Sequence, residues 1–235
     1  MSEGLPAVYL ARMDVEQAGL PFFMTWYEQK HGPDLIAAGF FSAQAYHSVV
    51  GEPFVCNVYE IESSEIFYTS AYQTARTPER DPDRPKILAG VSNRSNTVYE
   101  QVVTTGVMLP DVPWAAGGRR GQIDAPVIST VRFETSAEDD GAVVEWCRQV
   151  EFPRLEAGNG FRAARLCRQA GRLHPANPSD QPRWMLLIEW QDEGAAQSAG
   201  LSSEVSARLR AGPFDPSRID YNLAVLVTSL RDSGD

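Results

Sequence analysis

Short stretches in which β-branched and aromatic residues dominate predict strands. Residues 8–15, 41–49 and 54–61 are of this kind, and so are residues 97–104. The turn Gly51-Glu52-Pro53 separates two of these runs at hairpin distance. We therefore expect a single strand, a hairpin and a closing strand in the first part of the chain.

Helical spacing appears between these strands. Residues 16–31 carry apolar side chains at that spacing, and Gly32-Pro33 is expected to end the helix; the apolar residues are Leu20, Phe23 and Tyr27. Ser63 and Ser64 suit the start of a second helix over 64–76, and the proline-rich residues 77–86 after it predict a loop. The order is thus strand, helix, two strands, helix, strand.

The chain contains an internal repeat. Shifted by 120 positions, residues 6–47 align without a gap on 126–167, and nine of these 42 positions are identical. The identical residues are Pro6, Arg12, Trp26, Gln29, Pro33, Leu35, Ala37, Phe41 and Ala43 with their counterparts 120 positions later. The second copy has a longer loop between its middle strands and a predicted helix over 193–210. We infer a duplicated βαββαβ unit.

This order predicts an α+β fold of two tandem ferredoxin-like units. The first unit spans 1–108, a Pro- and Gly-rich linker covers 109–125, and a degenerate second unit spans 126–235. Four antiparallel strands with helices on one face leave the other face of each sheet uncovered. The two sheets are therefore expected to pack together as an α/β barrel within one chain.

Composition and charge exclude several classes of function. With 235 residues, 43% of them hydrophobic, the chain is long enough and apolar enough to bury a core. Its net charge of −10 argues against binding nucleic acid or an anionic membrane surface. Three cysteines, Cys56, Cys147 and Cys167, predict buried thiols rather than disulfides. With no apolar leader or span, we expect a cytoplasmic protein.

Residues 26–49 resemble the EthD-like branch of the dimeric α/β-barrel superfamily. The resemblance rests on an aromatic residue, a histidine closely followed by proline, and a glycine-aromatic step into a strand: Trp26, His31, Pro33 and Gly39-Phe40-Phe41. It implies the barrel fold, but the superfamily includes cofactor-free isomerases, cyclases, dehydratases and decarboxylases, monooxygenases and haem enzymes. The second copy departs from the pattern, with Glu151 at the position of His31. One active pocket per chain is therefore expected.

Two histidines are the candidate catalytic residues. His31 lies at the predicted C-terminal end of the first helix, where the helix dipole favours a protonated imidazole able to act as acid or base. His47 alternates with Phe41, Ala43 and Ala45, so it is expected on the helix-covered face of its strand, turned toward His31. A helix-terminal histidine that binds the last carbonyls, or a satisfied core histidine, are the structural alternatives.

Aromatic residues around these histidines predict a wall for a flat hydrophobic ligand. The substrate-binding candidates are Phe23, Trp26, Tyr27, Tyr46 and Tyr59, with Phe22 nearby. Ordinary core packing is the alternative for Trp26, which Trp146 matches, and Tyr46 could instead lie on the sheet face that meets the second copy. Glu60 and Glu189 are expected to be structural, and His174 is a weak candidate haem ligand in a loop. Histidine spacing predicts no metal site.

We expect a cofactor-independent lyase or isomerase, of the dehydratase, decarboxylase or cyclase type, acting on a hydrophobic cyclic or aromatic metabolite. The alternatives are a haem-dependent oxidoreductase of the same superfamily and a non-catalytic protein that binds a hydrophobic ligand. A small hydrophobic or aromatic substrate is the expected partner, and a homodimer is the assembly considered. Neither nucleic acid nor membrane is expected as a partner.

Overall fold

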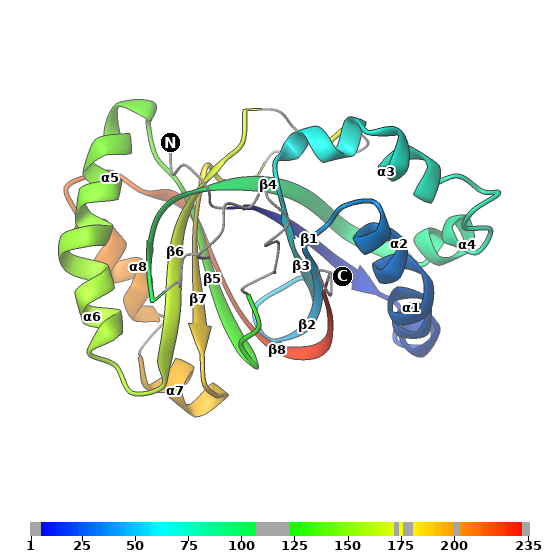
Figure 1. Cartoon of the computed structure of the whole chain (residues 1–235). Coiled ribbons are helices and arrows are strands. Elements are labelled where there is room, and N and C mark those ends of the chain that lie inside the picture. The colour runs from blue at the N-terminus through cyan, green and yellow to red at the C-terminus, as the bar shows by residue number, and fades with distance from the viewer. Residues whose placement is uncertain (1–5, 107–122, 172–173, 176–180, 200–202, 232–235) are drawn as a thin grey trace.

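One closed antiparallel barrel is the centre of the computed structural model, which describes residues 6–106, 123–171, 174–175, 181–199 and 203–231 (Figure 1). Around the barrel the strands follow the order β1-β3-β2-β8-β5-β7-β6-β4. Their bounds are β1 (Ala7–Val15), β2 (Ser42–Val50), β3 (Val55–Ile61), β4 (Val91–Thr105), β5 (Val127–Glu134), β6 (Phe161–Gln169), β7 (Trp184–Trp190) and β8 (Ser217–Arg231). The α+β barrel expected from the sequence is confirmed.

Each half of the chain contributes four neighbouring strands, β4-β1-β3-β2 and β8-β5-β7-β6. The halves join edge to edge, because β2 pairs with β8 and β4 pairs with β6. β4 and β8 are 15 residues long, well beyond the predicted 97–104. Their length lets each pair with a strand of its own half and with one of the other half. Sheet edges that would otherwise be open are thus hydrogen-bonded.

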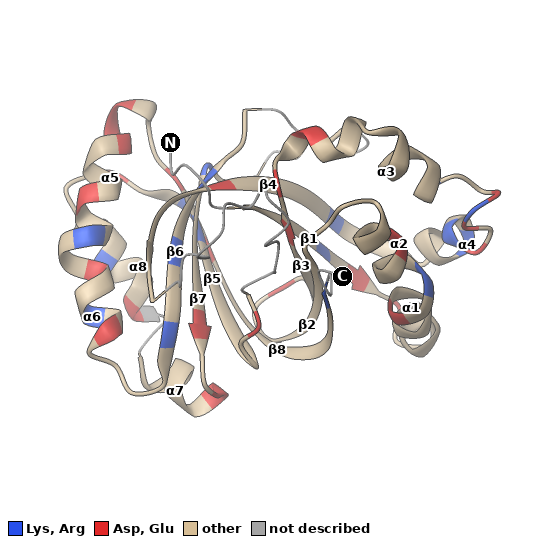
Figure 2. Ribbon diagram, in the orientation of Figure 1, with Lys and Arg blue, Asp and Glu red and all other residues tan. Residues whose placement is uncertain are grey.

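Helices lie outside the barrel in two groups, α1–α4 on one side and α5–α8 on the other (Figure 1). Their bounds are α1 (Leu20–Trp26), α2 (Gly32–Ala37), α3 (Ser70–Ala75), α4 (Arg84–Ala89), α5 (Asp140–Trp146), α6 (Phe152–Glu156), α7 (Glu193–Ser198) and α8 (Ser203–Arg210). Acidic and basic residues occur in both groups (Figure 2). No helix among the described residues is long and apolar enough to cross a membrane.

The predicted end of the first helix at Gly32-Pro33 is wrong. The helix continues to Ala37 through a π-helical turn, Tyr27–His31, in which the Gly32 N–H donates to the Tyr27 carbonyl. Pro33 then lies in the first turn of α2, where the backbone N–H that proline lacks is not needed for a helical hydrogen bond. The second half repeats this arrangement with the π turn Cys147–Glu151.

Two further expectations need correction. The predicted helix 64–76 is divided into a 3₁₀ turn, Ser64–Tyr68, and α3, with Thr69 capping the latter. The predicted loop over 77–86 contains the start of α4, because Pro85 occupies its first turn, the helical position that proline favours. The prediction of a loop treated proline only as a residue that ends helices.

Three apolar clusters form the core. Two lie between the barrel and its helices, and the third fills the barrel with residues that include Val8, Leu10, Tyr46, Val58 and Leu187. All three cysteines are buried and free, as predicted.

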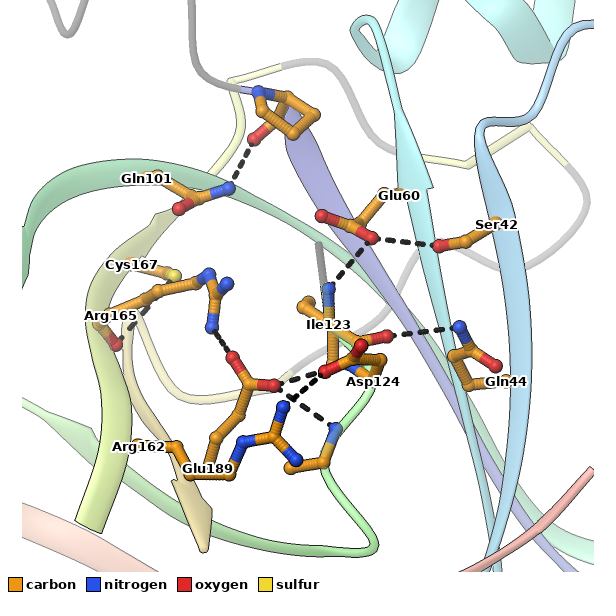
Figure 3. A network of polar contacts seen from close by, with 12 residues as sticks. Ser42, Gln44, Glu60, Gln101, Ile123, Asp124, Arg162, Arg165, Cys167 and Glu189 are labelled. Carbon is orange, nitrogen blue, oxygen red and sulfur yellow. Dashed lines mark hydrogen bonds and ion pairs between the residues drawn. The ribbon is translucent and has the colours of Figure 1, made fainter. Parts of the chain in front are cut away.

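A polar network closes one end of the barrel (Figure 3). The Glu60 carboxylate accepts hydrogen bonds from Ser42 and from the Ile123 N–H, and Glu189 pairs with Arg165. Glu189 also accepts from the backbone N–H groups of Asp124 and Ala125. The end of the predicted linker is therefore part of the barrel, and the other linker residues lie largely outside the described ranges. Both duplicated glutamates bind backbone N–H groups here, as their predicted structural role requires.

Candidate active site

A hollow opens between the outer face of the first-half strands and helices α1–α4. Its empty volume is about 530 Å³, which includes open space at the mouth. Tyr9 and Tyr59 line it from β1 and β3, and Phe23, Trp26 and His31 line it from the first helix. The hollow is narrow, aromatic and suited to a flat ligand.

His31 is fixed on one wall of the hollow. Its ring stacks on the Trp26 indole, with ring centroids 4.4 Å apart and planes 9° from parallel. The indole N–H donates to both carboxylate oxygens of Asp81, at 3.0 and 3.1 Å, which holds the stack in place. His31 is the last residue of the π turn, an irregularity that frequently occurs at functional sites.

The imidazole of His31 is neutral and its tautomer follows from its partner. The Arg84 guanidinium lies 3.2 Å from His31 Nδ1, and because an arginine only donates hydrogen bonds, Nδ1 must accept. The ring proton is therefore on Nε2. Burial lowers the pKa of His31 well below its usual value, and the charges of Arg84, Arg76 and Lys30 lower it further. The protonated imidazole expected from the helix dipole is wrong, because the helix does not end at His31.

His174 brings the second half of the chain into the site. Its ring stacks on Tyr9 at 5.6 Å and meets Phe67 edge-on at 4.7 Å, and its Nε2 lies 2.8 Å from the Tyr72 hydroxyl. The side chain is buried, and burial together with nearby arginines lowers its pKa to about 4. The hollow is thus built from both halves, although the first supplies most of its lining.

Three arginines line the same hollow: Arg76, Arg84 and Arg94. The guanidinium of Arg76 lies over the Tyr72 ring and that of Arg84 over the Trp26 ring, at 5.1 and 5.9 Å from the centroids. Asn57 adds a polar group from β3, and its buried Oδ1 accepts no hydrogen bond from the described residues. The site therefore offers cations and one unfilled acceptor between aromatic walls.

The predicted site residues divide into three groups. Phe23, Trp26, His31 and Tyr59 line the hollow, and Tyr27 is buried behind it, 6.0 Å from the His31 ring centroid. The remaining two, Tyr46 and His47, are absent from the described lining of the hollow.

Tyr46 points into the barrel, where its hydroxyl donates to the Ala125 carbonyl. It lies on the sheet face that meets the second copy, the alternative that strand alternation allowed. His47 shares the outer face of β2 with Ala43 and Ala45, as predicted, but its ring contacts Phe54 at 4.5 Å. The expected approach of His47 to His31 is wrong, because His47 lies further along β2 than the residues that the helices cover.

Several lining residues went unrecognised in the sequence. Arg76 is the last residue of the second predicted helix, Arg84 lies in the predicted loop over 77–86, and Arg94 lies after that loop, in β4. Asn57 alternates with Val55 and Tyr59 on β3, so a polar residue between apolar ones on a helix-covered face was a usable signal. His174 gave no local signal, because only the tertiary fold brings its loop to the first half.

In the second half, Glu151 takes the position of His31. It is fully buried, and Arg154 from α6 and Arg208 from α8 both bind its carboxylate. The same helix position thus carries a closed ion cluster in one half and a neutral imidazole beside a hollow in the other. The expected functional asymmetry between the copies has a clear geometric counterpart.

No protein-family model matches this chain, and no curated protein matches it in sequence. Solved structures match it over nearly its whole length. An anthrone oxidase-like protein is 14% identical with a TM-score of 0.65, covering 99% of this chain and 95% of its own. A candidate monooxygenase of Fusobacterium nucleatum is 9% identical with a TM-score of 0.62, covering 99% and 96%. The candidate chlorite dismutase TA0507 is 12% identical with a TM-score of 0.54, covering 96% of each chain.

This chain has the dimeric α/β-barrel fold. The resemblance noted in residues 26–49 therefore identified the correct superfamily fold. The narrower EthD-like assignment stays a prediction, because the matching structures are related to this chain at the level of fold.

Proposed function

We propose that this chain is an oxidoreductase that uses molecular oxygen to oxidise a planar, electron-rich aromatic compound in the first-half hollow. The matching structures include candidate monooxygenases and an anthrone oxidase-like protein, which favours the oxidoreductase alternative over the lyase or isomerase expected first. The observation that carries the proposal is the neutral His31 beside Arg84. Together they present an N–H donor and a cation to an oxygen that becomes anionic.

The chemistry follows from that arrangement. An anthrone that releases a proton to solvent becomes an electron-rich oxyanion, which the His31 Nε2–H and the guanidinium stabilise, and the peroxide anion formed with oxygen takes a proton back from solvent. Such an anion reacts with oxygen at carbon, and loss of water from the resulting hydroperoxide leaves a carbonyl, so that a CH₂ group and O₂ give C=O and H₂O. The aromatic walls hold the ring flat and limit water around it.

The residues of the hollow do not fit haem. The Nε2 of His31 carries the ring proton, because Nδ1 accepts from Arg84, so this ring offers no lone pair to iron. The Nε2 of His174, the nitrogen that would have to bind iron, is engaged by Tyr72, and its ring is held between Tyr9 and Phe67. We therefore derive no step through haem. A Soret band after incubation of the purified chain with haem would contradict this assignment.

The test uses 1,8-dihydroxyanthrone, whose oxidation to the anthraquinone is followed by absorbance with and without oxygen and against a protein-free control. His31→Phe keeps the stack on Trp26 but removes both ring nitrogens, and we expect kcat/KM to fall by about 10²–10³. His47→Phe is the matched control and should retain wild-type turnover. Wild-type rates in a folded His31→Phe protein, or no oxygen-dependent turnover at all, would overturn the proposal.

A further inference from the structure

The hollow concentrates positive charge in an acidic protein. The chain carries a net charge of −10, yet three arginines line one hollow and no carboxylate does so among the described lining residues. Arg84 and Lys86 are both in α4, visible as the blue segments of that helix in Figure 2. The field reaches both histidines, since Arg76 and Arg84 lower the pKa of His31 and of His174.

Arg76 and Arg84 have no carboxylate partner among the described residues. Both guanidinium groups contact rings: Arg76 lies over Tyr72, and Arg84 lies over Trp26 and donates to His31. The nearby Asp81 is buried, and both of its oxygens accept from the Trp26 indole. The aromatic faces thus hold the two guanidinium groups at the hollow, and the N–H donors of Arg76 are available to a ligand.

The second half indicates what such an arginine binds. There Arg208 of α8 pairs with the carboxylate of Glu151, which occupies the position of His31 in the repeat. α4 and α8 are each the last helix before the final strand of their half, and Arg84 contacts His31 as Arg208 contacts Glu151. In the first half a neutral histidine replaces the internal carboxylate, and the hollow lies beside it.

Asn57 supplies a second requirement for the ligand. Its Oδ1 is buried in the lining and accepts no hydrogen bond from the described residues, so a ligand that donates one there removes the cost of burying an unsatisfied acceptor. A hydroxyl group is a neutral donor of suitable size. The site therefore complements a molecule with an anionic group, a flat ring system and a hydroxyl.

We propose that the hollow selects aromatic compounds that carry a carboxylate, bound by Arg76, with a ring hydroxyl donating to Asn57. This rests on the proposed function, because it names the substrate class of the same site. A carboxylate suits the planar guanidinium fork, which can bind both of its oxygens.

Binding tests the inference without turnover. 9-Anthracenecarboxylate and its neutral methyl ester share one fluorescent ring and carry no hydroxyl, and the wild-type chain should bind the carboxylate at least about tenfold more tightly, with a preference that falls as salt is added. Arg76→Gln should abolish most of that preference, and Arg76→Lys should retain part of it. Arg80→Gln is the control, because Arg80 is exposed and pairs with Asp34 outside the hollow.

Equal affinity for the two probes, or a preference that survives in Arg76→Gln, would overturn the inference. Turnover separates it from the proposed function. Oxidation of 1,8-dihydroxyanthrone without a carboxylate preference overturns the selectivity alone, whereas a carboxylate preference without any oxidation leaves the anion site and overturns the oxidase. If both hold, 1,8-dihydroxyanthrone bearing a 3-carboxylate should show the higher kcat/KM.

Discussion

His31 and His174 owe their lowered pKa values first to burial and then to the surrounding arginines. A neutral imidazole can lie beside a guanidinium group only if a ring nitrogen accepts a hydrogen bond from that group or points away from it. At His31 the proton is on Nε2, so the ring can donate a hydrogen bond to an anion. In the function we propose, stabilisation of an oxyanion takes the place of the acid-base role expected from a protonated His31.

His174 makes stability depend on pH. Its pKa is about 4 in the folded chain and about 6.5 when unfolded, so the unfolded state binds more protons between these values. The stability from the neutral ring is complete above pH 6.5 and is lost as the pH falls toward 4, by up to about 1.4 kcal/mol per pH unit. Urea unfolding across this range should show a shallower acid dependence in His174→Gln than in the wild type. Parallel curves for the two proteins would contradict the assignment.

At the scale of elements, the π turn before each Pro is the feature that the repeat preserves most faithfully. Tyr27–His31 and Cys147–Glu151 occupy the same place in their halves although their sequences differ. The extra residue in the turn lets the helix continue past Pro33 and directs His31 toward the hollow. The matched residues Trp26 and Pro33 serve this geometry, and the unmatched His31 is the residue to which we assign the proposed chemistry.

The hairpin turn at Gly51 is required where the two halves join. Gly51 has φ +81°, and a Cβ there would fall inside van der Waals contact of the Tyr221 carbonyl oxygen on β8. Gly51→Ala should therefore destabilise the chain by at least about 2 kcal/mol, measured by urea unfolding. Gly141→Ala is the matched control. Gly141 lies in α5, a Cβ there meets nothing within 4 Å, and the substitution should stabilise the folded chain by up to about 1 kcal/mol. Equal effects of the two substitutions would exclude a special role for the turn.

At the scale of the whole molecule, the barrel is one closed structure and its interior is divided between apolar and charged layers. Arg165 and Glu189 form a buried ion pair at the end closed by residues 123–125. Glu189 also accepts hydrogen bonds from the backbone N–H groups of Asp124 and Ala125, so the pair holds the end of the predicted linker against the barrel. The two units predicted at 1–108 and 126–235 share one barrel, and their division into separate domains stays a prediction.

Removing one partner of this pair should be costly. Arg165→Met leaves the Glu189 carboxylate buried without its cation, and we expect a loss of about 3–5 kcal/mol in chemical unfolding. Adding Glu189→Gln removes that charge and keeps an oxygen for the Asp124 and Ala125 N–H groups, so the double variant should recover much of the loss. A double variant less stable than Arg165→Met would show that the pair does not act as described.

Much of the fold follows from the sequence alone. Strand alternation and the 120-residue repeat predict two βαββαβ units and the faces of their strands, because side-chain period and burial are local properties. The same alternation placed Ala43 and Ala45 under the helices and allowed Tyr46 on the inner face. The motif shared with the EthD-like branch pointed to Trp26 and His31, since neighbouring residues on one helix can be recognised without tertiary information.

Tertiary structure alone decided the composition of the site. His174 reaches the first-half hollow only because β4 pairs with β6 and closes the barrel, and His47 falls outside it because helix cover ends before that point of β2. The charge state of His31 also depends on long-range contacts, since Arg84 is 53 residues away in the chain. Periodicity in a sequence reports which face a residue occupies, whereas pKa, tautomer and pocket membership depend on what other segments bring to that face.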